Sequence, residues 1–289
     1  MQPTPTRPPS PYSSPDASAL PASLSPTARA LRSSAQAQLP SLTFPEVAVD
    51  ARQHVVSGTA LYTTLGYLVA GIIMTVATVA SGGAFLAVLA LGAVISWFQA
   101  RKVRALIRGS GVQVSARQLP ELHAMVESFS RRLGLSTVPE VYIVEENVQN
   151  GFAVKLGKKN LILLTDDVVW GALQSRDPRA LGFVIGHELA HIALNHAGGI
   201  RSLLRTTFPP LARADELSSD NVAAQLVGDA RIAIHGLALL TVGPQLLPYI
   251  NEEALLQQAR EVSADRLSKK AERALSHPLI LRRIGNLLR

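Results

Sequence analysis

A long run without charged side chains constrains this fold more than any other feature of the sequence. No Asp, Glu, Lys or Arg occurs from Gln53 to Ala100. Leu61–Ala80 is long enough for a helix to span a bilayer, Ala84–Ala100 is a second, shorter candidate, and Ser81-Gly82-Gly83 is a turn between them. A buried hairpin in a soluble protein is the alternative. The length of the run favours a transmembrane helical hairpin, which with its basic flank covers residues 53–108.

The charges after this run predict its orientation. Arg101, Lys102, Arg104 and Arg108 follow it, whereas the turn carries no charge. By the positive-inside rule, both ends of the hairpin and everything after it face the cytoplasm. The net charge is +7, but the Lys and Arg residues are scattered and no aromatic residues are interleaved with them. This pattern argues against nucleic acid as a partner and favours an anionic lipid membrane.

Residues 186–191 read Gly-His-Glu-Leu-Ala-His and contain the pattern His-Glu-x-x-His. On a helix, His187 and His191 lie on one face, one turn apart, where their imidazoles can bind a single Zn²⁺. Glu188 lies about 100° further round the helix. It can therefore reach a water on the metal without being a ligand, and it is the candidate catalytic base.

The surrounding sequence predicts that the motif lies on one largely buried helix. Asp177 is a suitable N-cap, and Pro178 follows at the first helical position. Residues 180–197 are mostly apolar, and Gly198-Gly199 supplies a stop. A chance match is the alternative. Burying ionisable residues on so apolar a helix would be costly unless they have a partner. We expect that partner to be a metal ion, one zinc ion per chain.

The third zinc ligand has two candidates. The chain has no cysteine, so the ligand must be His, Asp or Glu. Glu216 with Asp220, and Glu261 with Asp265, both place an Asp one turn after a Glu, where it can orient a ligand histidine. We prefer Glu216, because its helical stripe is small and apolar while the stripe through Glu261 is charged. His196 is expected to be a buried histidine beside the ligands, with metal ligation as its alternative.

Residues 109–289 are expected to form an α+β domain that is mainly α and has a small β-sheet. We expect strands at 140–144, 151–156 and 161–165, and helices at 120–134, 211–227, 230–240, 252–273 and 279–288. Residues 203–211 read as a loop. Asn150, Gly151, Phe152 and Ala153 begin the second strand, which is a candidate edge strand for pairing with an extended substrate. An ordinary hairpin strand is the alternative.

The first residues of the chain read as a tail. Ten of the 18 prolines fall within residues 1–45, and few residues there could form a core. We therefore predict a disordered Pro/Ser-rich tail over residues 1–52, with no apolar segment of the kind a secretory signal needs.

With these motifs in place, the chain resembles the HtpX-like and CAAX-prenyl-protease-like family of membrane-bound zinc metallopeptidases. The resemblance covers roughly residues 109–289. The motifs that carry it are Gly186-His187-Glu188-Leu189-Ala190-His191 with His196, Arg213-x-x-Glu216-x-x-x-Asp220, Asn150-Gly151-Phe152-Ala153, and Ser276-His277-Pro278-Leu279 followed by Arg283-Ile284. The chain departs from the family at Gly151, where Ala is usual, and at Ser218-Ser219-Asp220-Asn221, where Ser-Ala-Asp-Arg is usual.

The resemblance implies a zincin-like domain whose activity is that of a zinc endopeptidase. It would hydrolyse membrane or misfolded proteins at the cytoplasmic face of a bacterial inner membrane. His277 has no assigned role; packing with Pro278 is the default, and assistance to the oxyanion is the alternative. Two rival functions are a membrane-anchored chaperone-like or scaffold protein with a vestigial zinc site, and a different zinc hydrolase. Neither the natural substrate nor the oligomeric state can be predicted.

Overall fold

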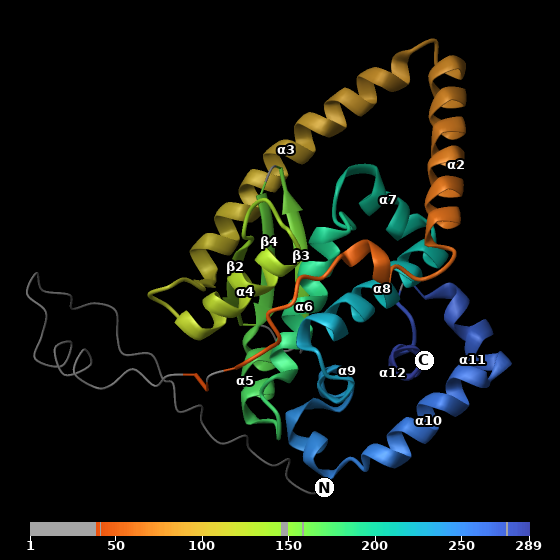
Figure 1. Cartoon of the computed structure of the whole chain (residues 1–289). Helices are drawn as coiled ribbons and strands as arrows, with labels where there is room; N and C mark the ends of the chain where they lie inside the picture. Colours follow the sequence, from red (N-terminus) through yellow and green to blue (C-terminus); the bar gives the residue numbers. More distant parts are fainter. Residues whose placement is uncertain (1–38, 41, 146–149, 158, 276) are drawn as a thin grey trace, which may run out of the picture. The chain divides into compact units, whose positions relative to one another are not determined.

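The computed structural model describes residues 39–289, apart from residues 41, 146–149, 158 and 276 (Figure 1). The predicted tail up to residue 38 lies outside the described residues. The helices are η1 (Ala51–His54), α2 (Thr59–Ala80), α3 (Ala84–Ser110), α4 (Pro120–Arg132), α5 (Asp166–Gln174), α6 (Ala180–Ala193), α7 (Gly199–Thr207), α8 (Pro209–Val227), α9 (Ala230–Leu246), η2 (Leu247–Tyr249), α10 (Glu252–Ala264), α11 (Arg266–Ala271), η3 (Glu272–Ala274) and α12 (Ile280–Leu287). The strands are β1 (Val112–Gln113), β2 (Glu140–Val144), β3 (Gly151–Leu156) and β4 (Lys159–Thr165). The predicted class, α+β and mainly α, is confirmed.

Helices α2 and α3 form the expected hairpin, joined by a turn at residues 81–83 (Figure 1). Both are long and apolar enough to cross a membrane, and their apolar side chains are almost entirely exposed. An exposed apolar surface of this extent needs lipid or a partner to cover it. Helix α9 with η2 also meets the length and composition of a span, but nearly half of it is buried inside the domain.

The four described strands form a single mixed sheet in the order β1-β2-β4-β3. Strand β2 pairs in parallel with β4, while β1 and β3 pair antiparallel with their neighbours. Strand β3 therefore lies at an edge of the described sheet. The register matches Phe152 with Leu163 and Ala153 with Ile162, which fixes how β3 faces α6.

Helix α6 is the centre of the core, since every residue from Ala180 to His191 is buried. It packs closely on α8 because Gly186 has no side chain: a Cβ there would lie 3.3 Å from Leu226 Cδ1 and 3.4 Å from Ala223. Interior packing at this density holds the two helices in a fixed register. The site described below is built on these two helices.

The ends of α6 differ from the prediction. The helix begins at Ala180, and Asp177 does not cap it. The Asp177 carboxylate instead accepts hydrogen bonds from the backbone and guanidinium of Arg179 in the preceding turn. The helix ends at Ala193, because Asn195 takes a left-handed conformation with φ 56°. Gly199 starts α7 and is not a stop for α6.

Other elements also differ from the prediction. Helix α5 was not predicted; Thr165 caps it by accepting a hydrogen bond from Val168 N. The expected loop at 203–211 is helical apart from Phe208, because Pro209 occupies the first position of α8, which tolerates proline. The single helix expected at 252–273 is broken at Asp265, whose carboxylate caps α11.

The predicted tail boundary at residue 52 is wrong, because the described residues just before it are packed on the domain. Val49 and Ala51 belong to the core, and the Phe44 ring packs edge-on against Phe129 at 5.0 Å. Arg132, at the end of α4, donates a hydrogen bond of 2.8 Å from Nε to the carbonyl of Val47. This segment is therefore part of the folded domain.

Candidate metal centre

Three buried side chains converge between α6 and α8. The Nε2 atoms of His187 and His191 lie 3.0 Å apart. Glu216, from α8, places one carboxylate oxygen 3.4 Å from His187 Nε2 and the other 3.3 Å from His191 Nε2. Among the described residues, these three form a group of donors that could hold one metal ion.

His187 is oriented from its far side by a carboxylate. Its Nδ1 lies 2.9 Å from Asp220 Oδ1. Arg283, from α12, donates to both oxygens of that carboxylate, at 2.6 and 2.8 Å. An ionised Asp220 accepts the Nδ1 proton, so Nε2 is the nitrogen that faces the metal position. Burial lowers the pKa of His187, but the hydrogen bonds to Asp220 and Glu216 outweigh it and raise the pKa to about 9 without a metal.

His191 is oriented through a second histidine. Its Nδ1 lies 2.9 Å from His196 Nδ1, and His196 Nε2 lies 3.3 Å from Asp215 Oδ1. If His196 donates its Nε2 proton to Asp215, its Nδ1 accepts the proton of His191 Nδ1. The Nε2 of His191 is then unprotonated. Burial lowers the pKa of His191 to about 4, which keeps this ring neutral at pH 7.

Arginine and histidine side chains surround the carboxylate of Glu216. Arg205, from α7, donates a hydrogen bond of 2.7 Å to Oε1, and His277 Nδ1 lies 3.4 Å from Oε2. Burial alone would raise the pKa of Glu216, but the neighbouring His191 and His187 hold it well below its usual range. Glu216 is therefore ionised at neutral pH, the state in which a carboxylate binds metal.

Glu188 lies between this group and strand β3. A Cβ on Gly151 would lie 3.2 Å from Glu188 Cγ and 3.4 Å from Glu188 Oε1. Burial raises the pKa of Glu188, while His187 and a backbone hydrogen bond from Ala153 oppose the rise. The side chain is thus held against the edge strand.

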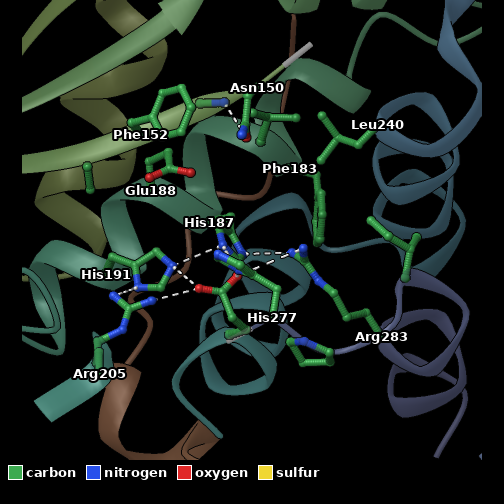
Figure 2. Close-up of a pocket in the computed structure, with 16 residues that line it drawn as sticks. Asn150, Phe152, Phe183, His187, Glu188, His191, Arg205, Leu240, His277 and Arg283 are labelled. Atoms are coloured by element: carbon green, nitrogen blue, oxygen red, sulfur yellow. Dashed lines mark hydrogen bonds and ion pairs between the residues drawn. The ribbon is translucent and has the colours of Figure 1, made fainter. Parts of the chain in front are cut away.

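A cavity of about 470 Å³ opens in front of these residues (Figure 2). Its lining includes Asn150, Gly151, Phe152 and Ala153 from the start of β3, the three converging donors, Glu188, Arg205, His277 and Arg283. The size is that of a ligand-binding pocket. Figure 2 shows Phe152 and Asn150 on one side of the cavity and His277 and Arg283 on the other.

The donor set fits a tetrahedral metal ion. Bonds of about 2.1 Å to a tetrahedral zinc place its ligand atoms about 3.4 Å apart. The two Nε2 atoms here lie 3.0 Å apart, and each lies 3.3 or 3.4 Å from a different oxygen of the Glu216 carboxylate. Two imidazole nitrogens and a carboxylate at these distances fit a cation that displaces the proton of His187, and this His₂Glu combination leaves a fourth position open.

The structure brings together the residues that the sequence analysis selected. Asp220 contacts His187, and His196 contacts His191. The carboxylate of Glu216 lies close to both His187 and His191. The rival Glu261 is exposed on α10, where it accepts a hydrogen bond from Gln257. His277 is mostly exposed and lines the cavity, so the expected packing role belongs to the buried Pro278 alone.

Three residues near the site received no role from the sequence. Arg205 reaches Glu216 from α7, Arg201 pairs with the buried Asp215, and Arg213 donates to the carbonyls of residues 272, 273 and 275, just before His277. Arg201 and Arg205 lie one turn apart on a short amphipathic segment. This spacing was the one feature of the sequence that could have indicated their role. Arg213 stood within a family motif, but its long-range partners could not be inferred.

Comparison with known proteins gives the class of this chain. Residues 116–206 match the family model described as Peptidase family M48. Similar curated proteins, each named "Protease HtpX homolog", occur in Gemmatimonas aurantiaca, at 29% identity over 55% of this chain and 55% of the relative, and in Salinibacter ruber, at 26% over 63% and 61%. A third, in Methanocaldococcus jannaschii, is 31% identical over 34% of this chain and 33% of the relative.

The residues that match the M48 model contain strands β2 to β4 and helix α6 with His187 and His191, so the chain is similar to an M48-type peptidase over this stretch. The chain is similar to the HtpX-like family of M48 membrane metallopeptidases, and these matches support the resemblance drawn from the sequence. The chain spans between a third and three fifths of the length of the curated relatives it matches. No solved structure matches it.

Proposed function

We propose that this protein is a membrane-anchored zinc endopeptidase. Its substrates are membrane or misfolded proteins, which it cleaves at the cytoplasmic face of a bacterial inner membrane. The relatives' name, "Protease HtpX homolog", and the M48 match support proteolysis. The exposed apolar hairpin and the basic residues that follow it support the membrane location and its orientation.

The observation that carries this proposal is the position of Glu188. It lies between a buried His-His-Glu group and the edge strand β3. The scissile bond of a substrate paired with β3 would therefore be close to Glu188 and to the His-His-Glu group. When bound, zinc supplies Lewis-acid chemistry, which polarises a carbonyl and makes water acidic near neutral pH. Glu188 takes the proton of the attacking water on its carboxylate and returns it to the leaving amine.

The other residues hold this arrangement in place. His187, His191 and Glu216 would hold the zinc ion. Asp220 and His196 accept the Nδ1 protons of the two histidines and thereby fix the direction of both rings. A fixed geometry matters because hydrolysis requires the base, the water and the carbonyl to be aligned before the reaction begins.

Strand β3 is suited to bind an extended peptide. The Thr165 N–H donates to the Asn150 carbonyl, so residue 150 and every second residue after it pair with β4. The backbone groups of Gly151 and Ala153 therefore point away from β4, toward the open edge. The Gly151 N–H already donates to Asn150 Oδ1 and the Ala153 N–H to Glu188. A substrate strand can therefore pair with the carbonyls of these two residues, and such pairing recognises the main chain without requiring one sequence.

The test compares the full-length protein with Glu188→Gln in detergent, using casein cleavage and zinc content. We expect the variant to keep one zinc per chain and to lose about 10²–10⁴-fold in rate, because the base is removed and the ligands remain. Wild-type cleavage by the variant would exclude this mechanism. A wild-type protein that binds zinc but cleaves no protein substrate would instead favour the scaffold function with a vestigial site.

A further inference from the structure

Helix α7 presents an apolar side that no described part of the domain covers. Ile200 and Leu203 are 51% and 63% exposed, although they lie on the same helix as the fully packed Leu204. On the other side, Arg201 and Arg205 pair with the buried carboxylates of Asp215 and Glu216. The helix is therefore amphipathic, with its charges directed into the domain and two large apolar side chains directed out.

The neighbour of α7 is the domain end of the first membrane-spanning candidate (Figure 1). Arg201 Nη1 lies 3.3 Å from Thr63 Oγ1, and the Tyr62 and Phe208 rings meet at 6.0 Å. A Cβ on Gly66 would lie 3.3 Å from Leu204 Cδ1. These contacts fix α7 against the first two turns of α2.

The length of α2 sets the depth of these contacts. Its 22 residues extend about 33 Å, and the hydrocarbon core of a bilayer is about 30 Å thick, so nearly the whole helix is needed to cross it. Gly66 is about 10 Å along α2 from its first residue. An element that contacts Gly66 must therefore lie at the membrane interface or just inside it, and not in bulk water.

We propose that α7 is an interfacial helix, whose exposed residues Ile200 and Leu203 insert into the lipid surface next to α2. Amphipathic helices of this kind lie in the plane of the membrane with their apolar side about 5–10 Å below the headgroups, the depth that the contacts with α2 impose. Continuity with the apolar surface of the hairpin favours lipid over a protein partner. Because Arg205 lies on this helix and lines the cavity, the lipid surface is then next to the candidate site.

The absence of cysteine from the sequence permits a direct test. Ile200→Cys and Leu203→Cys are each labelled with a polarity-sensitive fluorophore in the full-length protein, reconstituted into nanodiscs with one copy per disc. The lipids carry a nitroxide either beside the headgroup or at the end of the acyl chain. Leu267→Cys, at a residue that is 75% exposed on α11, is the matched control.

We expect the headgroup-proximal nitroxide to quench both α7 labels several-fold more than the control, and the chain-end nitroxide to quench them less. Adding Leu203→Glu to the Ile200→Cys protein should reduce the quenching, because a charge opposes insertion. Quenching no greater than at residue 267 would overturn the proposal. So would labels that are shielded only in discs holding two copies, which would identify a second copy as the occupant. Neither result depends on whether the protein is a protease.

Discussion

His187 Nδ1 lies 2.9 Å from Asp220 Oδ1, and Arg283 donates two hydrogen bonds to the same carboxylate. The three side chains come from three helices, α6, α8 and α12. Asp220 is completely buried, and the pairing with Arg283 and His187 holds its pKa below the usual range in spite of that burial. The ionised carboxylate of Asp220 therefore sets the orientation of the imidazole ring of His187, one of the proposed metal ligands.

Asp220→Asn should weaken zinc binding by about 10–100-fold, the usual effect of removing the group that orients a ligand histidine. Titration against a chromophoric chelator measures the affinity. Asp265→Asn is the control, because Asp265 is an exposed cap of α11, and it should bind zinc like the wild type. An unchanged affinity in Asp220→Asn would show that the carboxylate does not orient His187.

The size of the residue at position 151 should control activity without affecting the metal. A Cβ there would lie 3.2 Å from Glu188 Cγ and 3.3 Å from Val184, contacts that a shift of a few tenths of an ångström can relieve. We expect Gly151→Ala to stay active and Gly151→Val to lose about 10²-fold in rate, since the larger side chain displaces Glu188. Zinc content should be the same in both variants. Equal rates for the two would contradict this close contact.

Arg132 should contribute strongly to stability. Its guanidinium donates to the carbonyls of Leu226 at 2.7 Å and of Val47 at 2.8 Å, and so joins α4 to α8 and to the segment before α2. Arg132→Met leaves these carbonyls without their donors and should cost about 3 kcal/mol. The melting temperature in nanodiscs should then fall by roughly 6–12 °C. The neighbouring exposed residue provides the control: Arg131→Met should melt within a degree or two of the wild type, and an equal loss in both variants would contradict this role.

These examples show what the sequence could predict. The hairpin, the class of fold and the convergence of His187, His191 and Glu216 follow from local patterns: an uncharged run, helical spacing, and an apolar stripe around one carboxylate. The contacts of Arg132, and the path from His191 through His196 to Asp215, join segments distant in the chain. Their side chains carry no periodic signal. Helix α7 was missed because its two arginines satisfy carboxylates that only the folded protein brings near.

The orientation of the hairpin makes a separate prediction. A reporter fused after Arg289 should report the cytoplasm, because the basic residues Arg101 to Arg108 follow the second helix and the turn between the helices has no charge. The protein should also remain in the membrane after carbonate extraction. A reporter signal from the opposite side of the membrane would reverse the assignment of the catalytic face.

The zinc content of two glutamate variants distinguishes Glu216 from Glu261 as the third ligand. Glu216 lies among the histidines, whereas Glu261 is exposed on α10 with a similar Asp one turn later. We predict that purified, folded Glu216→Ala loses both zinc and casein cleavage, while Glu261→Ala keeps one zinc per chain and full activity. Stoichiometric zinc in Glu216→Ala together with its loss from Glu261→Ala would contradict the account and place the third ligand on α10.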